Sequence, residues 1–317
     1  MKAYMGIDVG SVSTNIAVLS HAGEILADLY IRTRGRPLEA ILAGLTEIAG
    51  LLPAEVEICG CGSTGSGRYL AGVMIGADVI KNEITAHAVA ASIYVPDVQT
   101  VLEIGGQDSK IIIMRNGIVT DFAMNTVCAA GTGSFLDQQA SRLNIPIADF
   151  GELALSSSAP VRIAGRCTVF AESDMIHKQQ MGHKLTDIIN GLCEALVRNY
   201  LNNVGKGKEI LSPVVFQGGV AANAGIKAAF ERALGLPIII PRHFGVMGAI
   251  GAAQLAREEV EKTGQTLFKG FKIAGLPYRT GSFECGGCPN NCEIAEIYEE
   301  DRVIGRWGAR CQRWDVL

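Results

Sequence analysis

The sequence has no uninterrupted apolar run of the ~18 residues that a membrane-spanning helix needs, no excess of basic residues and no cleavage pattern of a secretory signal peptide. Its 28 Lys and Arg residues are set against 32 Asp and Glu residues, and the formal net charge is −4. These absences argue against a nucleic-acid or membrane partner, and we expect a cytoplasmic protein. Because nine cysteines in a reducing compartment do not make a disulfide framework, clustered cysteines become candidate metal ligands.

The chain also lacks the G-x-x-x-x-G-K-[ST] sequence of P-loop proteins, which excludes that class of nucleotide site. It nevertheless has 38 glycines among 317 residues, well above the usual ~7%. Many of these glycines directly follow apolar runs. Such placement is typical of turns at which the backbone approaches a ligand closely.

One strand-and-turn pattern occurs twice. A strand through Asp8 ends in a glycine turn at Gly10, and two more strands and a helix follow it. The same order recurs from residue 100, where Glu103 aligns with Asp8 and Gly105 aligns with Gly10. A duplication of two strand-rich halves that face one ligand is typical of ATPases of the actin/sugar-kinase/Hsp70 class. We therefore expect a duplicated α/β fold with two lobes around an ATP cleft.

From about residue 263 the aliphatic runs thin out, while Gly and Cys become more frequent. We expect a first ATPase lobe at 1–95, a second lobe with the cluster cysteines at 96–262 and a small Cys-rich extension at 263–317. Helical periodicity predicts helices at 37–49, 83–92, 132–143, 168–180, 185–202, 221–234 and 246–261.

The glycine turns predict the ATP site, because exposed backbone N–H groups bind phosphate oxygens. Asp8 is expected to hold Mg²⁺ through water, Gln107 to orient an attacking water, and Glu103 to complete the catalytic carboxylates. The expected nucleotide-binding residues are Gly10, Ser11, Gly105, Gly106, Gly131, Gly133, Gly218, Gly219 and Asn223.

Cys128 and Cys167 stand in matching settings, 39 residues apart. A helical stretch follows each of them, and helix N-termini stabilise thiolates and negatively charged clusters. Two cysteines are half of a four-thiolate site, so our interpretation is that two copies of the chain hold one iron–sulfur cluster between them. Cys59, Cys61 and Cys193 are instead expected to be small buried hydrophobes.

Five segments carry a family resemblance: G-I-D-V-G-S at 6–11, I-G-G-Q-D at 104–108, C-A-A-G-T-G-S-F-L-D at 128–137, C-T-V-F-A-E-S at 167–173 and G-G-V at 218–220. Through them, residues 4–260 resemble the ATP-dependent activators of 2-hydroxyacyl-CoA dehydratases, within the BadF/BadG/BcrA/BcrD ATPases. One departure is Glu103, which stands where we expect an aspartate before the I-G-G-Q-D turn. Its contact with Mg²⁺ is therefore left open.

The resemblance implies that Cys128 and Cys167 of each subunit ligate a single [4Fe–4S] cluster on the two-fold axis of a homodimer. It further implies that one electron passes, coupled to ATP hydrolysis, from a donor such as ferredoxin or flavodoxin to an iron–sulfur acceptor enzyme. A 2-hydroxyacyl-CoA dehydratase, a benzoyl-CoA-reductase-type enzyme and a double-cubane cluster protein all fit as acceptors.

The C-terminal extension has its own cysteine motif, C-x₂-C-x₃-C followed by a fourth cysteine. This spacing predicts a second metal site, and both Zn²⁺ in a structural knuckle and a second iron–sulfur cluster fit it. The alternative is a set of reduced free thiols. The candidate ligands are Cys285, Cys288, Cys292 and Cys311.

Two other function classes fit the expected fold. A sugar or acid kinase would need an aspartate base in the cleft and no thiolate pair, and a clear sugar-binding signature is missing. A nucleotide switch without catalysis would only assemble with a partner. His177 and His183 flank a polar loop after the Cys167 helix, and we expect them to be solvated or to face a partner.

Overall fold

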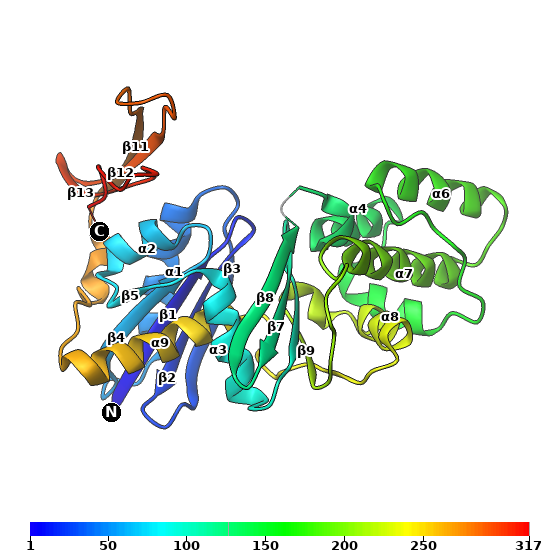
Figure 1. The fold of residues 1–317 in the computed structure, drawn as a ribbon, viewed down its shortest axis with the longest axis horizontal. Helices are drawn as coiled ribbons and strands as arrows, with labels where there is room; N and C mark the ends of the chain where they lie inside the picture. The colour runs from blue at the N-terminus through cyan, green and yellow to red at the C-terminus, as the bar shows by residue number, and fades with distance from the viewer. Residues whose placement is uncertain (126, 317) are drawn as a thin grey trace. The chain divides into compact units, whose positions relative to one another are not determined.

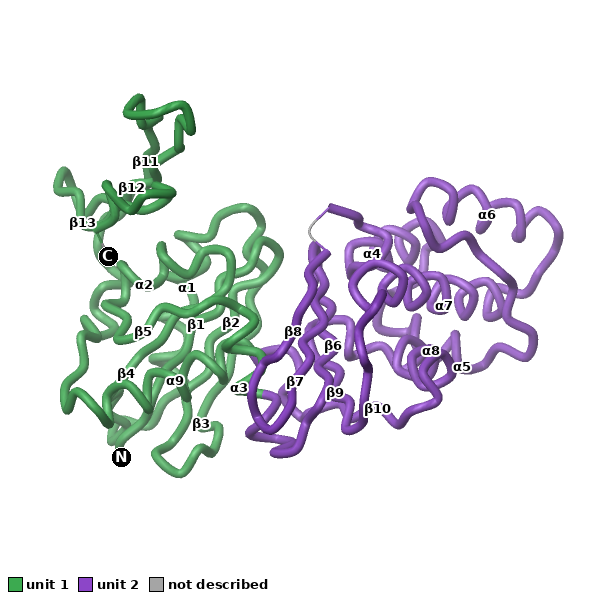
Figure 2. The backbone as a smooth tube through the Cα atoms, in the orientation of Figure 1, with its two compact units in different colours: residues 1–90, 248–317 green, residues 91–247 purple. Residues whose placement is uncertain are grey.

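The computed structural model describes residues 1–125 and 127–316, which form two compact units (Figure 1, Figure 2). Unit 1 consists of residues 1–90 and 248–317, and unit 2 consists of residues 91–247. Each unit has its own five-stranded sheet and its own hydrophobic core.

The sheet of unit 1 has the strand order β3-β2-β1-β4-β5. β1 pairs antiparallel with β2 and parallel with β4, and all its residues except the first are buried. Burial on both faces is typical of a central strand in an α/β sheet. The carboxyl end of β1 therefore leads from the core into the first glycine turn. The strands are β1 (Lys2–Val9), β2 (Ser13–Ser20), β3 (Ile25–Arg32), β4 (Glu57–Thr64) and β5 (Val79–Ile80).

The sheet of unit 2 repeats this topology, with the order β10-β9-β6-β7-β8. β6, β7 and β8 form an antiparallel meander, and β9 runs parallel to β6 just as β4 runs parallel to β1. The predicted duplication and the predicted fold class are thereby confirmed. The strands are β6 (Thr100–Ile104), β7 (Ser109–Arg115), β8 (Ile118–Asn125), β9 (Val214–Gln217) and β10 (Ile238–Ile239).

Local sequence explains where several helices begin and end. Pro37 is the first residue of α1, where its missing N–H costs no helical hydrogen bond. The Asn223 side chain caps α8 by accepting a hydrogen bond from the Ile226 amide, and Gly235 ends that helix with a φ of 66°. The helices are α1 (Pro37–Leu51), α2 (Arg68–Ile75), α3 (Glu83–Tyr94), α4 (Gly133–Arg142), α5 (Phe150–Leu155), α6 (Thr168–Gln180), α7 (Leu185–Asn203), α8 (Ala224–Leu234) and α9 (Met247–Thr263), with 3₁₀ helices η1 (Ala129–Gly131), η2 (Ile147–Asp149), η3 (Gly219–Ala222) and η4 (Phe271–Gly275).

Helix α9 packs closely on the sheet of unit 1. A Cβ atom added at Gly6 would lie 2.5 Å from the Ala253 nitrogen, and one at Gly60 would lie 2.9 Å from a Val260 methyl group. Only glycine on the strands permits this approach. The contacts place α9 with unit 1, whereas the predicted limits placed it in the second lobe. Apart from the placement of α9, the domain limits 1–95, 96–262 and 263–317 remain a prediction.

The C-terminal extension folds into a three-stranded antiparallel sheet, β11 (Tyr278–Glu284), β12 (Glu293–Glu299) and β13 (Arg302–Trp307). Ile273 and Ile297 belong to the core of unit 1, and Gly305 lets β13 approach Val73 of α2, where a Cβ would lie 2.6 Å from a valine methyl group. The extension is therefore packed on unit 1 through apolar contacts that the sequence analysis did not anticipate.

Most predicted helices are present, and α6 has the predicted limits. The short helices α2 and α5 and all three strands of the extension were not predicted from the sequence. In the described part of the chain, no helix is both long and apolar enough to cross a bilayer.

Candidate functional site

The first glycine turn lies at the carboxyl end of β1 in unit 1. The Gly10 amide donates a hydrogen bond to the carbonyl oxygen of Ser13 at 2.8 Å, and the Thr33 hydroxyl donates one to the carbonyl oxygen of Gly10 at 3.0 Å. Because these bonds use the polar groups of Gly10 inside the turn, Ser11 is left exposed at its tip. A turn of this shape can offer the Ser11 amide and hydroxyl to an anion.

Asp8 is buried just before this turn, and glycines surround its carboxylate. A Cβ atom at Gly65 would lie 2.5 Å from Asp8 Oδ1, and one at Gly248 would overlap Asp8 Oδ2. Gly65 also has a φ of +91°, which few other residues adopt. Sequence reasoning missed both glycines as site residues, although a glycine-rich stretch at 60–67 was visible.

The second glycine turn, after β6 in unit 2, is held by the first turn of α4. The Gly133 amide donates to the carbonyl oxygen of Gly105 at 2.9 Å, and the Ser134 amide donates to that of Gly106 at 2.8 Å. Gln107 follows and is exposed. Gly133 was predicted to contact the nucleotide. Its N–H already has a partner in the protein, so Gly133 positions the glycine turn instead.

A buried lysine links the acidic residues at this turn. Lys110 Nζ lies 3.0 Å from Glu103 Oε2 and 2.9 Å from Asp108 Oδ2, and the side chains of Glu103 and Lys110 are both buried. A buried carboxylate is stable only when its charge is compensated in this way. Lys110 was missed from the sequence, where the one signal is a lysine at the start of the apolar run Ile111–Met114.

The duplicated topology allows the surroundings of Asp8 in unit 1 to be compared with those of Glu103 in unit 2. In register, Glu103 pairs with Lys110 across the antiparallel ladder, and Asp8 pairs with Asn15 at the equivalent place. At this position of the two ladders, Glu103 of unit 2 therefore lies beside a lysine and Asp8 of unit 1 lies beside an asparagine.

The Gly218–Gly219 turn follows β9. Gly218 has a φ of +88°, and a Cβ atom there would lie 2.5 Å from the carbonyl oxygen of Ile104 and 2.7 Å from Glu103 Oε1. Glycine is thus required for this turn to pack against the end of β6. The Asn223 side chain, which was predicted to lie near adenosine, caps α8 through a 3.1 Å hydrogen bond from the Ile226 amide.

Cys128 lies in a loop that Asn125 holds. The Asn125 side chain accepts a hydrogen bond from the Cys128 amide at 3.0 Å and donates one to the Cys128 carbonyl at 2.8 Å. Cys128 caps the 3₁₀ helix η1, and α4 begins only at Gly133. The helix predicted at 132–143 is confirmed to within one residue at each end, and η1 lies between it and Cys128. Gly131, a predicted nucleotide-binding residue, belongs to η1, and a Cβ atom added there would lie 2.7 Å from Asn199 Oδ1.

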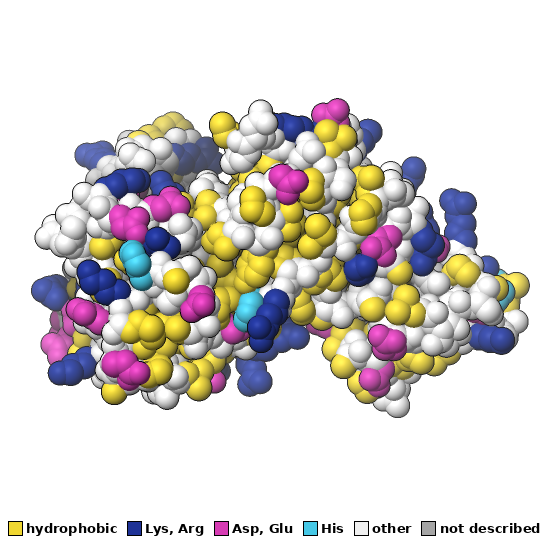
Figure 3. Space-filling view, turned by 90° about the horizontal axis from the view of Figure 1, so that it is seen from below, with side chains coloured by type: hydrophobic (Ala, Val, Ile, Leu, Met, Phe, Trp, Pro, Cys, Tyr) yellow, Lys and Arg dark blue, Asp and Glu magenta, His cyan; other side chains and the backbone are white. Residues whose placement is uncertain are grey.

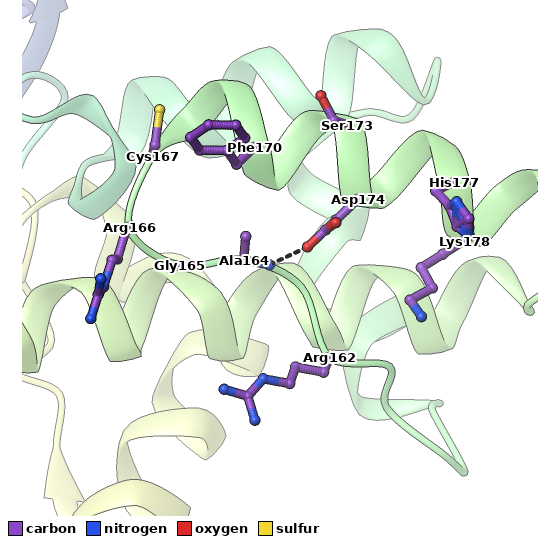
Figure 4. Close-up of a pocket in the computed structure, with 10 residues that line it drawn as sticks. All are labelled: Arg162, Ala164, Gly165, Arg166, Cys167, Phe170, Ser173, Asp174, His177 and Lys178. Carbon is purple, nitrogen blue, oxygen red and sulfur yellow. Dashed lines mark hydrogen bonds between the residues drawn. The ribbon is translucent and has the colours of Figure 1, made fainter.

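Cys167 directly precedes α6, as predicted, with extended backbone at the N-cap position. It lines an open groove of about 940 Å³, shown in Figure 4. In this view the Cys167 sulfur and the Phe170 ring extend to one side of segment 162–167, while the Arg162 and Arg166 side chains extend to the other. Phe170 is 66% exposed, which is high for a phenylalanine.

Asn199 of α7 joins the two cysteine loops. Its Nδ2 donates to the carbonyl oxygen of Gly165 at 2.6 Å and lies 3.9 Å from Cys128 Sγ. Cys128 Sγ also lies 3.9 Å from the carbonyl oxygen of Arg166, next to Cys167. The chain therefore brings the two predicted cluster cysteines together, although sequence reasoning did not find Asn199.

The two loops fit half of a thiolate cluster site. Both cysteines are partly exposed, and each precedes the N-terminus of a helical turn, where a negative charge is stabilised. Two exposed apolar residues lie near the thiols in sequence. Val127, which is 95% accessible, precedes Cys128, and Phe170 follows Cys167 by three residues.

The four cysteines of the extension are only partly gathered. The Cys285 amide donates to the Cys292 carbonyl at 2.8 Å, and Trp314 Nε1 donates to Cys285 Sγ at 3.1 Å. The indole hydrogen bond, with a smaller contribution from the Gly287 amide, lowers the pKa of the Cys285 thiol. Among the described residues, no group of three or more His, Cys, Asp or Glu side chains is arranged to hold a metal ion.

Two of the other cysteines are buried, as predicted. Burial raises the pKa of the Cys193 thiol to about 12, and it also raises the pKa of Cys61. Cys59 is only partly buried. Cys61 and Cys193 therefore behave as core residues rather than as ligands.

Known proteins match most of the chain. The profile of the BadF/BadG/BcrA/BcrD ATPase family matches residues 5–256. The (R)-2-hydroxyglutaryl-CoA dehydratase activating ATPase of Acidaminococcus fermentans is 37% identical over 263 residues, which are 81% of this chain and 98% of that protein. One component polypeptide of the benzoyl-CoA reductase of Thauera aromatica is 28% identical, over 84% of this chain and 98% of that polypeptide.

Solved structures agree. The crystal structure of component A of the A. fermentans dehydratase has a TM-score of 0.76 at 35% identity and covers 82% of this chain and 100% of its own. An activator of 2-hydroxyisocaproyl-CoA dehydratase from Clostridium difficile, solved with bound ADPNP, has a TM-score of 0.76 at 32% identity and covers 83% of this chain and 97% of its own. Fold and motifs thus define an ATPase with the duplicated actin-type architecture. The chain belongs to the BadF/BadG/BcrA/BcrD ATPase family.

Proposed function

We propose that this protein is an ATP-dependent activator that passes single low-potential electrons to an iron–sulfur partner enzyme. In this proposal, Cys128 and Cys167 from each of two subunits hold one [4Fe–4S] cluster between the subunits of a homodimer. The observation that carries the proposal is the meeting of both cysteine loops at Asn199, where each thiol stays accessible. Membership of a family of ATPases with dehydratase activators supports it.

We assign ATP to the glycine turns. Ser11 and the backbone after Gly106 would bind phosphate oxygens, Asp8 would hold Mg²⁺ through water, and the exposed Gln107 would orient the attacking water. Glu103 keeps Lys110 in place instead of contacting the metal, since the two form a buried ion pair. The bound ADPNP of the similar C. difficile activator supports nucleotide binding by this chain.

When bound, a [4Fe–4S] cluster supplies a site that stores and releases one electron. The chain supplies the thiolates, the asparagines that hold their loops and the coupling to ATP. Lowering the potential of an electron by roughly 300 mV costs on the order of 7 kcal/mol. Because a static environment cannot both accept and expel such an electron, ATP hydrolysis would have to change the surroundings of the two cysteines.

The relatives support one acceptor class over the others. The 37% identity to a dehydratase activator favours a 2-hydroxyacyl-CoA dehydratase, ahead of a benzoyl-CoA-reductase-type enzyme or a double-cubane cluster protein. A ferredoxin or flavodoxin is the expected donor.

For the extension we propose a second metal site, holding either one Zn²⁺ ion or an iron–sulfur cluster, with Cys285, Cys288, Cys292 and Cys311 as its ligands. The hydrogen bonds from Trp314 and Gly287 favour the Cys285 thiolate, which is the form that binds metal. Metal analysis of the Cys285→Ser/Cys288→Ser variant tests this separately. We expect it to lose one Zn²⁺ per chain, or the iron of a second cluster, and to keep the iron bound by Cys128 and Cys167.

The main test is anaerobic purification followed by iron and sulfide assays, size-exclusion chromatography and assays of ATP hydrolysis. We expect a brown dimer. Cys128→Ser and Cys167→Ser should each lose about 4 Fe per dimer, while the control Cys59→Ser should keep them. Electron delivery to a dehydratase should need both ATP and a reductant.

A colourless protein that transfers phosphate from ATP to a small hydroxylated molecule would contradict the proposal and favour a kinase. A protein that binds ATP and a partner without hydrolysis would favour a nucleotide switch. Equal iron content in wild type and both cysteine variants would remove Cys128 and Cys167 as ligands.

A further inference from the structure

We propose that a basic groove beside Cys167 docks the acidic surface of the small electron-carrier protein that reduces this activator; this inference rests on the function proposed above. The basic groove is defined by Arg162, Arg166, His177 and Lys178, which line the cavity in Figure 4. None of these four side chains belongs to the proposed ATP site or to the proposed cluster ligands, and His177 was expected to be solvated or to face a partner.

Positive charge exceeds negative charge among the described residues of this region, both in the number of side chains and in the number that lack an ion-pair partner. Between residues 162 and 184 the chain has four Lys or Arg residues and two Asp or Glu residues. Glu172 forms an ion pair with Arg142 at 2.9 Å. Asp174 also lines the groove and keeps its negative charge while it accepts a hydrogen bond from the Ala164 amide at 2.9 Å, so three Lys or Arg side chains share the groove with one carboxylate. The cations Arg162, Arg166 and Lys178 have no carboxylate within 4 Å among the described residues.

The positive charge of the groove is opposite in sign to the net charge of the chain. The chain has a net charge of −4, and on the face drawn in Figure 3 side chains of both signs are interspersed with apolar ones. Unpaired cations concentrated in one groove attract an acidic surface over several ångströms, and the attraction guides its approach.

The position of the groove suits an electron carrier. Cys167 and the cations belong to one short segment, and in Figure 4 Arg162, Arg166 and Lys178 extend away from the side of the Cys167 sulfur. A second subunit that contributes to a shared cluster would cover the thiol side. The cations would stay open, and a carrier bound there would lie close to the cluster ligands.

A transient protein partner fits better than a small anion. The groove is open, and Arg162, Arg166 and His177 are exposed rather than enclosed around one point. Small, charge-dominated surfaces are typical of brief electron-transfer encounters, whereas tight complexes bury larger apolar areas. This contrast also favours the electron donor over the acceptor enzyme as the occupant.

The test compares wild type with Arg162→Glu/Lys178→Glu, using a reduced acidic ferredoxin as the probe. Stopped-flow absorbance follows oxidation of the ferredoxin at low ionic strength. We expect the second-order rate constant to fall about tenfold or more in the variant and to lose most of its salt dependence. Lys81→Glu/Lys206→Glu, which changes two exposed cations elsewhere by the same charge, should match the wild type.

Reduced methyl viologen, a small cationic reductant, distinguishes a loss of ferredoxin docking from general damage to the protein or its cluster. It should reduce wild type and the groove variant at similar rates. The neutral variant Arg162→Gln/Lys178→Gln should show an intermediate ferredoxin rate and guards against misfolding caused by added carboxylates. Equal ferredoxin rates in all four proteins would overturn the inference, as would a defect seen only in electron delivery to a dehydratase.

A binding measurement keeps this inference distinct from the proposed function. Titration calorimetry with ferredoxin should show salt-sensitive binding to wild type and loss of binding in the Glu variant, whether or not the protein contains iron. A protein that contains no iron but binds ferredoxin would therefore contradict the proposed function and still support the docking surface. If the substitutions abolish binding of inorganic phosphate but leave ferredoxin binding intact, the groove is a small-anion site and the inference fails.

Discussion

The side-chain amide of Asn199 donates a hydrogen bond to the carbonyl oxygen of Gly165 at 2.6 Å while its nitrogen lies 3.9 Å from the sulfur of Cys128. One buried side chain on α7 thus fixes two loops that are far apart in the sequence. Its oxygen accepts a hydrogen bond from Asn203 at 2.9 Å, which sets the orientation of the amide. The spacing of the thiols consequently depends on a residue that is not a ligand.

Replacing Asn199 with Ala should loosen both cysteine loops. Loss of its buried hydrogen bonds should cost about 1–3 kcal/mol of unfolding free energy. In the iron-free protein, Cys128 should react faster with a thiol reagent such as DTNB. In the loaded protein, loss of an N–H group near the thiolate should lower the reduction potential. Asn202→Ala, an exposed change on the same helix, is the control, and identical labelling rates and potentials in both variants would contradict a positioning role.

Lys110→Met should destabilise the protein by about 3–5 kcal/mol, because it leaves the buried Glu103 carboxylate without a compensating charge. The double variant Lys110→Met/Glu103→Gln should recover much of this loss. Urea unfolding gives both values. Lys208→Met removes the partly exposed ion pair with Asp121 and should cost less than about 1 kcal/mol. A similar small loss for Lys110→Met would show that the buried pair is not needed for folding.

The sequence was sufficient for features that repeat or that are local. The duplicated meander follows from the alignment of Asp8 with Glu103, and the start of α6 after Cys167 follows from helical periodicity. Both cysteine loops could be assigned because their motifs are long. Apart from the repeat, each of these signals lies within a few consecutive residues, where backbone geometry couples them directly.

The missed residues have partners that are remote in the sequence. Asn199 lies 71 residues from Cys128, and Gly248 lies 240 residues from Asp8. An asparagine inside a helix or a glycine at a helix start has no local pattern that reveals such a contact. Lys110 was missed for a different reason, since a single charged residue in an apolar strand is as compatible with a sheet edge as with a buried ion pair.

Gly248→Ala should impair ATP hydrolysis while the fold persists. Alanine normally stabilises a helix relative to glycine by up to about 1 kcal/mol, but its methyl group here would overlap the Asp8 carboxylate. Displacing a catalytic group by about 1 Å can cost roughly 100-fold in rate. Gly50→Ala on α1, where an added Cβ meets nothing within 4 Å, should leave hydrolysis unchanged. Full activity in Gly248→Ala would exclude Asp8 from the nucleotide site.

The buried thiol of Cys193 predicts a loss of stability at alkaline pH. Burial raises its pKa from 9.0 to about 12, so the folded protein keeps the proton at a pH where the unfolded chain releases it. The unfolded state then binds fewer protons, and the unfolding free energy falls as pH rises from about 9 towards 12. Each pH unit in this window is worth at most about 1.4 kcal/mol. Cys193→Ala removes the titrating group, so the stability difference between wild type and variant should shrink by on the order of 1–2 kcal/mol between pH 9 and 10.5 in urea titrations. Parallel curves for the two proteins would mean that the thiol reaches solvent in the native state.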